Sequence, residues 1–169
     1  MAEFNSAENL NMNMAENLST DVMTGGLDER MFLYFRLSGS MKKADGVDII
    51  VSFLMESGVK MILKDLDQAL QRGAKIRILT GNYLGITQPS ALYLIKRKLG
   101  DQVDLRFYND PKRSFHPKAY MFHYATYSEM YIGSSNVSRS ALTSGIEWNY
   151  RFNSKTDPES YQKFYETFE

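Results

Sequence analysis

Short apolar runs alternate with amphipathic segments in the middle of the chain. Residues 47–54 are rich in β-branched and apolar side chains, which is the pattern of a buried strand. Residues 75–80 and 103–108 form two further runs of this kind. Between these runs, the apolar positions of residues 58–72 and 89–99 recur at the spacing of one helix face. This order of strand, helix, strand, helix and strand predicts a parallel α/β sheet.

The pattern changes in the second half of the chain. Residues 115–124 and 129–133 are strand-like and are separated by a short polar turn, which predicts a hairpin. Ser138 is placed to cap a short helix over residues 139–143. Residues 146–152 then alternate between apolar and polar side chains, as a half-buried strand does. We therefore expect further strands beside the parallel ones.

The two ends of the chain differ in character. Residues 1–25 are polar, rich in Asn and Met and weakly periodic, so we expect a flexible N-terminal arm. Residues 27–43 suit either a helix or an extended segment that packs on the domain. An Asp-Pro pair at residues 157–158 opens a final helix, and the chain stops within it. We therefore expect residues 26–169 to be one domain of a longer protein.

Composition narrows the class of protein only a little. Hydrophobic residues make up 43% of the chain and charged residues 24%, which is ordinary for a globular domain. The chain has no cysteine, no apolar run long enough to cross a bilayer and no signal peptide, so we expect a cytoplasmic protein without a membrane partner. Because the formal net charge is zero, attraction to nucleic acid would have to come from a local patch.

The candidate chemistry lies in the second half of the chain. His116 and Lys118 are separated by one residue, so their side chains would point the same way if this stretch is extended. An imidazole beside an ammonium group suits an anion, and phosphate is the first to consider. Residues 133–136 form a Gly/Ser turn that ends in Asn136, and Glu147 is a carboxylate among apolar residues. Each of these alone is more often structural, but their joint occurrence indicates a site.

Two other kinds of site are poorly supported by the sequence. His116, His123 and Glu147 could in principle bind zinc, but their spacing matches no familiar zinc motif and no cysteine is available. A serine hydrolase would require a Gly-x-Ser-x-Gly elbow, which the sequence does not contain. We therefore expect no metal and no cofactor.

These segments together resemble the phospholipase D-like superfamily. The motif of that family is His-x-Lys followed by a Gly/Ser-rich turn with Asn, and this chain has His116-Pro117-Lys118 and then residues 133–136. The closest likeness is to the single-motif nuclease branch, which includes a small bacterial endonuclease, metal-independent restriction enzymes and nuclease-like domains joined to superfamily II helicases. In that branch a glutamate follows the Asn, and Glu147 matches it. The resemblance covers roughly residues 47–153.

The resemblance implies a fold and a mechanism. The fold would be an α/β half-unit, a mixed sheet flanked by helices, that pairs into a homodimer. His116 would attack phosphorus and form a phosphohistidine, while a second histidine protonates the leaving oxygen. Lys118 and Asn136 would hold the nonbridging oxygens, with Ser134 as a further donor. Glu147 would accept a hydrogen bond from a histidine Nδ1. Because the chain has a single His-x-Lys, two copies would each supply a His116 to one shared site.

One position departs from the family pattern. Many members have an aspartate where this chain has His123. This departure weakens the interpretation as a lipid hydrolase more than the interpretation as a nuclease. From the strand pattern alone, we expect His123 to be a residue at a strand end and not a second catalytic histidine.

Basic residues precede the motif and favour a polyanionic substrate. The candidate nucleic-acid contacts are Lys96, Arg97, Lys98, Lys112 and Arg113, although the first three would equally suit the solvent face of a helix. We expect a domain that cleaves DNA, with RNA also open, in a protein of the helicase-fused or restriction type. Two alternatives stay open: a silent domain that binds nucleic acid or mediates dimerisation, and a hydrolase of another phosphodiester such as a phospholipid.

Overall fold

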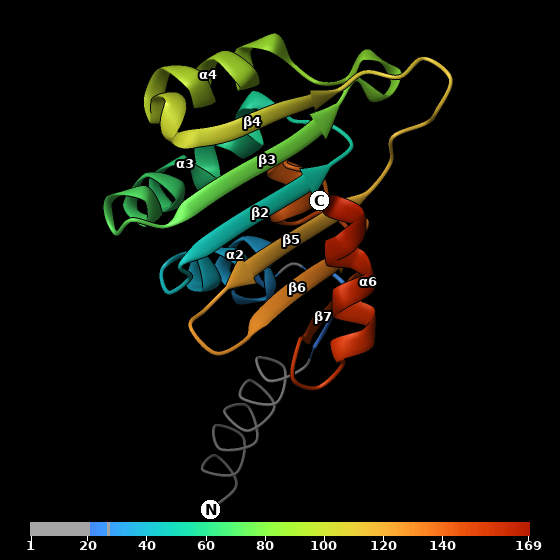
Figure 1. The fold of residues 1–169 in the computed structure, drawn as a ribbon. Coiled ribbons are helices and arrows are strands. Elements are labelled where there is room, and N and C mark those ends of the chain that lie inside the picture. Colours follow the sequence, from blue (N-terminus) through green and yellow to red (C-terminus); the bar gives the residue numbers. More distant parts are fainter. Residues whose placement is uncertain (1–20, 27) are drawn as a thin grey trace, which may run out of the picture.

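The computed structural model describes residues 21–26 and 28–169, apart from the side chain of Arg30. Residues 1–20 of the predicted arm lie outside this part of the chain. The described residues form a seven-stranded sheet in the order β1-β7-β6-β5-β2-β3-β4, with helices against both faces (Figure 1). This arrangement confirms the expected α/β fold, a mixed sheet flanked by helices.

The first half of the domain is the parallel part of the sheet. Strands β2 (Gly46–Val51), β3 (Lys75–Gly81) and β4 (Val103–Tyr108) lie side by side and run parallel. Helix α3 (Glu56–Gln71) connects the first two strands, and helix α4 (Pro89–Leu99) connects the second and third. Parallel neighbours need such crossovers, and the predicted alternation of strands and helices is confirmed.

The second half is antiparallel. Strands β5 (Lys118–His123) and β6 (Ser128–Gly133) form the predicted hairpin, and β7 (Asn149–Asn153) pairs with β6. The short helix α5 (Arg139–Leu142) lies between β6 and β7, and the Ser138 side chain caps it by accepting a hydrogen bond from the Ala141 N–H at 3.2 Å. Because β5 also pairs antiparallel with β2, the two halves share one continuous sheet.

The remaining elements lie nearer the ends of the chain. Strand β1 (Val22–Met23), which the sequence assigns to the arm, pairs with the start of β7, and Met23 is buried there. Helix α2 (Leu33–Met41) occupies part of the segment for which helix and extended structure were both open. Helix α6 (Pro158–Phe168) is the predicted final helix. Three short 3-10 turns complete the list: η1 (Glu29–Met31), η2 (Tyr83–Gly85) and η3 (Gly100–Gln102).

The two faces of the sheet carry separate cores. On one face, α2, α3 and α4 cover a large cluster that includes Val47, Ile49 and Ile78. On the other face, α6 crosses the antiparallel strands and covers a smaller cluster around Met121 and Met130 (Figure 1). Burial of these apolar side chains on both faces is the main favourable term in holding the layers together.

The register of β2 and β5 defines two ends of the sheet. Val51 pairs with Lys118 at one end, and Gly46 pairs with His123 at the other. The first, which we call the Lys118 end, gathers the carboxyl ends of β2, β3 and β6 and the amino ends of β5 and β7. The second, the His123 end, gathers the opposite ends. Loops at the Lys118 end position the candidate site.

Two strands begin later than the sequence predicts. The expected strand over residues 115–124 begins at Lys118, because Pro117 has no N–H to contribute to a ladder and its carbonyl accepts a hydrogen bond from the Ser52 hydroxyl at 3.2 Å. The expected strand over residues 146–152 begins at Asn149. The residues before it are bound to the Gly/Ser turn instead, so His116, Ser134 and Glu147 lie outside the strands, whereas Lys118 begins β5.

Candidate active site

His116 and Lys118 lie together at the start of β5. The Lys118 Nζ atom is 2.8 Å from His116 Nδ1 and 2.9 Å from Nε2, and it donates to the His116 carbonyl at 3.1 Å. Only 7% of Lys118 is exposed, whereas His116 faces solvent. A buried ammonium group is stable only with polar or anionic partners. The pair therefore presents a fixed positive charge beside an accessible imidazole.

The surroundings favour the neutral form of the imidazole over the protonated form. Desolvation, and secondly the charge of Lys118, lower the pKa of His116 below its ordinary value. Desolvation also lowers the pKa of Lys118, while the charge of Glu147 opposes this shift. Because a ring nitrogen attacks only when it carries no proton, a lowered pKa favours nucleophilic use of His116.

The segment that carries His116 is held by aromatic rings. The Phe115 ring stacks on Tyr108 with centroids 4.7 Å apart, and it lies against Gly81. A Cβ atom at Gly81 would come within 2.7 Å of the Phe115 ring, so a larger residue there would displace that ring. The ring of Tyr83 lies on that of His116, with centroids 4.4 Å apart. The last residues of β3 and β4 and the loop after β3 therefore fix the backbone before β5.

Asn136 approaches the same end of the sheet from β6. Its side chain is buried, and its Oδ1 atom accepts a hydrogen bond from the Phe53 N–H at 3.2 Å. This bond turns the amide oxygen toward the loop after β2, which leaves the Nδ2 group in the role of donor. An amide donor fixed in this way is suited to a phosphate oxygen.

Ser134 and Glu147 are hydrogen-bonded to each other, with the serine hydroxyl as donor to Glu147 Oε2. The backbone of Trp148 fixes this pair, because its N–H donates to Ser134 Oγ and its carbonyl accepts from the Ser134 N–H, both at 3.0 Å. A side chain at Gly133 would collide with the Trp148 carbonyl. The predicted contact of Glu147 with a histidine is therefore not made to the His116 of the same chain.

The structure brings all five motif residues to the Lys118 end of the sheet. The loop after β2 joins two of their segments, since Ser52 binds the Pro117 carbonyl and Phe53 binds Asn136. The residues that gather there are His116, Lys118, Ser134, Asn136 and Glu147.

The predicted basic residues fall into two groups. Lys112 and Arg113 line a cavity of about 480 Å³ together with Tyr83 and Phe115, beside His116. Lys96, Arg97 and Lys98 lie in the last turn of α4. There Lys96 pairs with Asp101 at 3.0 Å and lines a separate cavity of about 1070 Å³ at the His123 end. The structure therefore does not bring the second group to the site.

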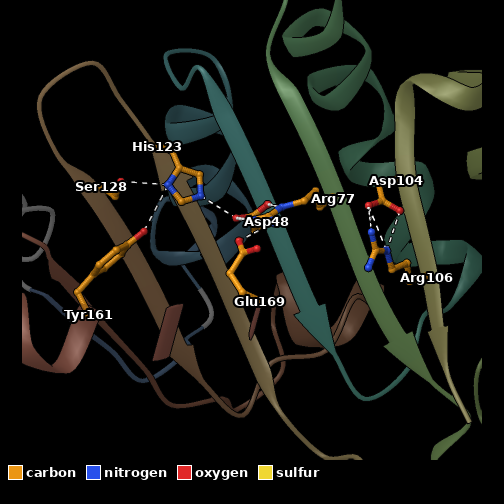
Figure 2. Close-up of polar contacts among 8 residues, drawn as sticks. All are labelled: Asp48, Arg77, Asp104, Arg106, His123, Ser128, Tyr161 and Glu169. Atoms are coloured by element: carbon orange, nitrogen blue, oxygen red, sulfur yellow. Dashed lines mark hydrogen bonds and ion pairs between the residues drawn. The ribbon is translucent and has the colours of Figure 1, made fainter. Parts of the chain in front are cut away.

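His123 ends strand β5, as the sequence predicts, and lies at the far end of the sheet. Figure 2 shows Asp48 on β2 between His123 on β5 and Arg77 on β3. The His123 Nε2 atom is 2.7 Å from Asp48 Oδ2, and its Nδ1 atom is 3.0 Å from Ser128 Oγ and 3.3 Å from the Tyr161 hydroxyl. His123 therefore ties β5 to β2 and α6 and lies at the opposite end of β5 from Lys118.

The Asp48 carboxylate is the central group of the cluster at the His123 end, where it binds both Arg77 and His123. Both guanidinium contacts from Arg77 to Asp48 measure 2.7 Å. Burial alone would raise the pKa of Asp48, but hydrogen bonds from Arg77 and His123 lower it below the ordinary value. The same bonds raise the pKa of Arg77. Arg77 also contacts Glu169 Oε1 at 2.6 Å, so the cluster is a network of ion pairs and hydrogen bonds that links β2, β3, β5 and the end of the chain.

Two kinds of feature are absent from the described residues. None of their helices is long and apolar enough to cross a membrane. They also contain no group of three or more His, Cys, Asp or Glu side chains arranged for a metal ion.

Sequence reasoning missed the supporting residues Ser52, Phe53 and Tyr83. All three follow strands of the parallel half, and the carboxyl ends of such strands meet at one end of a sheet. That rule could have drawn attention to the loops after β2 and β3. Which of their atoms contact the motif depends on the antiparallel pairing of β2 with β5.

The fold and the His116–Lys118 site define a phospholipase D-like domain. Residues 38–169 match the family model described as "Cardiolipin synthase, PLD-like domain", and the chain belongs to this phospholipase D-like family. No curated protein sequence matches the chain.

Several solved structures share the fold. Nuc from Salmonella typhimurium, described as a phospholipase D family member, is 20% identical with a TM-score of 0.57, covering 79% of this chain and 84% of its own. NucT from Helicobacter pylori is 16% identical with a TM-score of 0.56, and the match covers 78% of this chain and 82% of NucT. The archaeal chromatin protein TrmBL2 is 17% identical with a TM-score of 0.50, and the match covers 99% of this chain and 61% of TrmBL2. At these identities the likeness shows the fold, and the site must carry the argument for function.

Proposed function

We propose that this domain cleaves phosphodiester bonds of DNA without a metal ion, by attack of His116 on phosphorus. The observation that carries the proposal is the contact of the accessible His116 ring with the buried Lys118 ammonium at 2.8 Å. This arrangement supplies a nucleophile and a fixed positive charge in one place.

The proposed reaction has two steps. A neutral ring nitrogen of His116 forms a bond to phosphorus while the bond to the leaving oxygen breaks, and a second, protonated histidine gives that oxygen its proton. Water then attacks the phosphohistidine, gives a proton to the second histidine and releases His116. Lys118 and the Asn136 amide neutralise the nonbridging oxygens in both steps, with Ser134 as a further donor.

The second histidine would come from outside this chain, and a second copy is a more economical source than a separate partner domain. The other histidine, His123, lies at the far end of the sheet and is bound to Asp48. Within the described chain, Glu147 contacts Ser134 and not His116. In a two-fold dimer with the Lys118 ends together, Glu147 of one copy would accept a hydrogen bond from the His116 Nδ1 of the other. We therefore infer a homodimer with one shared site.

DNA is the proposed substrate, with RNA as a further possibility to be tested. Lys112 and Arg113 line a cavity with Tyr83, whose ring contacts His116, and this supports their proposed contact with phosphates that flank the cleaved bond. We further propose that residues 26–169 act as the nuclease part of a longer cytoplasmic protein of the helicase-fused or restriction type.

Two other functions have specific support. TrmBL2, a chromatin protein described as having a novel mode of DNA binding, shares the fold, so a DNA-binding domain without cleavage is the first alternative. The matching family model bears the description of cardiolipin synthase, so a phospholipid substrate is the second.

Cleavage assays in excess EDTA test the proposal, with the wild-type chain and His116→Ala prepared in parallel. Single-stranded DNA, double-stranded DNA, RNA and phosphatidyl ester vesicles serve as separate substrates. We expect DNA cleavage that survives EDTA and is lost in the variant, together with a phosphorylated His116 detectable by mass spectrometry after rapid quenching. Cleavage that EDTA abolishes would overturn the histidine mechanism. DNA binding without cleavage would favour the first alternative, and cleavage of the lipid alone would favour the second.

A further inference from the structure

A tyrosine outside the family motif contacts the proposed nucleophile directly. The rings of Tyr83 and His116 lie 4.4 Å apart between centroids and are inclined at 51°. At this separation the two rings are in van der Waals contact. His116 is an exposed residue, and this contact covers one side of its ring.

The turn that carries Tyr83 is itself held in place. Its backbone is closed by hydrogen bonds from the Gly85 N–H to the Asn82 carbonyl at 3.2 Å and from the Ile86 N–H to the Tyr83 carbonyl at 3.0 Å. Leu84 has a φ of 51°, a left-handed conformation that costs a residue other than glycine about 1 kcal/mol. A conformation with this cost persists only where its surroundings determine it.

The next residues anchor this turn to the loop after β2. The Thr87 hydroxyl donates to the Gly81 carbonyl at 2.5 Å and accepts from the Leu54 N–H at 3.4 Å. The Gln88 N–H donates to the Leu54 carbonyl at 2.9 Å. Tyr83 therefore projects from a rigid support that belongs to the parallel half of the sheet.

Lys118 approaches the same imidazole through its ammonium group. Its Nζ atom contacts both ring nitrogens, at 2.8 Å and 2.9 Å. The aromatic contact of Tyr83 and the polar contact of Lys118 together restrict the rotation of the His116 side chain. A nucleophile restricted in this way loses less conformational freedom on reaching the transition state.

We propose that Tyr83 is a positioning residue, whose ring holds the His116 imidazole in the orientation required for attack on phosphorus and shields it from water. The catalytic part of this role rests on the proposed function of His116, whereas the contact itself does not. Loss of the ring should lower kcat about tenfold with little change in KM, because orientation matters in the transition state.

The test compares Tyr83→Leu, which removes the aromatic ring, with Tyr83→Phe, which retains it. The full chain is labelled in its histidine rings, and both histidines are titrated by NMR. His123 serves as the internal reference because it lies at the opposite end of the sheet. Tyr93→Leu, at an exposed aromatic residue of α4, is the matched control. Cleavage rates and melting temperatures are measured for every variant.

In Tyr83→Leu we expect the pKa of His116 to rise toward its ordinary value, because water gains access to the ring, while the titration of His123 is unchanged. In Tyr83→Phe, the titration of His116 and the cleavage rate should both match those of the wild type. An unchanged titration and rate in Tyr83→Leu would overturn the inference, as would a rate that falls only with melting temperature. If the wild-type chain cleaves nothing, the proposed function fails, and the NMR titration still decides whether Tyr83 shields His116.

Discussion

At the scale of single residues, the site depends on the burial of one charge. Lys118 is 7% exposed, and its ammonium group contacts the His116 ring and the His116 carbonyl. The negative charge of Glu147 also acts on it electrostatically. A positive charge with so little water around it interacts strongly with an arriving phosphate. An exposed lysine such as Lys96, which already pairs with Asp101, has no such effect.

Lys118→Met should lower the cleavage rate by about a hundredfold or more, because one fixed donor to the phosphate is lost. The pKa of His116 should rise at the same time, since the Lys118 charge is one of the causes that lower it. Cleavage assays and NMR titration measure the two effects. Lys96→Met is the matched control and should cleave like the wild type, so equal losses in both variants would contradict the assignment of Lys118.

His123→Asp, which introduces the residue usual in the family, should destabilise this chain at neutral pH by about 1–3 kcal/mol, because it places a second carboxylate against Asp48. The loss should shrink as the pH falls and one of the two carboxylates takes up a proton. Urea unfolding at pH 7 and pH 5 measures this. Adding Asp48→Asn to the variant should recover stability, and a His123→Asp protein as stable as wild type at pH 7 would refute the structural role of the pair.

At the scale of the elements, the start of α3 supports the Asn136 segment. The Met55 N–H donates to the Val137 carbonyl at 2.9 Å, and Gly58 lies against the backbone of Val137 and Ser138. A Cβ atom at Gly58 would approach the Val137 carbonyl carbon to 2.4 Å. The helix and the turn that carries Asn136 can therefore be this close only with glycine at the contact.

Gly58→Ala should cost about 1–3 kcal/mol of unfolding free energy and lower the cleavage rate, because the added methyl group displaces the backbone next to Asn136. Gly39→Ala in α2 is the matched control: a Cβ atom there meets no atom within 4 Å. In a helix that substitution should raise stability by about 0.5–1 kcal/mol. Chemical denaturation and cleavage assays compare the two, and a Gly58→Ala protein with wild-type stability and rate would show that the contact is not tight.

At the scale of the whole molecule, the domain supplies one half of the proposed site. The sheet places His116 at one end and His123 at the other, so a single chain cannot bring two histidines to one phosphate. A closed two-fold pair would bring both His116 side chains to a common centre. The activity of mixed dimers is therefore a direct test of the arrangement.

Mixing wild type with an equal amount of His116→Ala, under conditions of free subunit exchange, should leave about one quarter of the wild-type activity, since only pairs of intact subunits contain both histidines. Independent sites would leave about one half. Cleavage assays on the mixture measure the fraction, and analytical ultracentrifugation of each protein checks that both form dimers. A residual activity of one half would overturn the shared site.

The order of strands and helices was predictable because it depends on local patterns. The limits of β4 and α4 agree with the apolar spacing of the sequence, and Ser138 caps α5 as its residue type predicts. The starts of β5 and β7 were not predictable in this way. The strands start after Pro117 and Trp148. The carbonyl of Pro117 binds the Ser52 hydroxyl and that of Trp148 binds the Ser134 N–H, and no local sequence pattern contains these contacts.

By itself, the sequence determined the motif residues and the type of fold, because residue types, short spacings and hydrophobic periodicity are local properties. Only the tertiary structure decided that His123 belongs to the Asp48 network, that Lys96 lies far from the site and that Tyr83 covers His116. Each of these depends on the register between β2 and β5, which joins two halves of the chain that are distant in sequence. Local periodicity cannot specify that register, because it arises from the packing of the complete sheet.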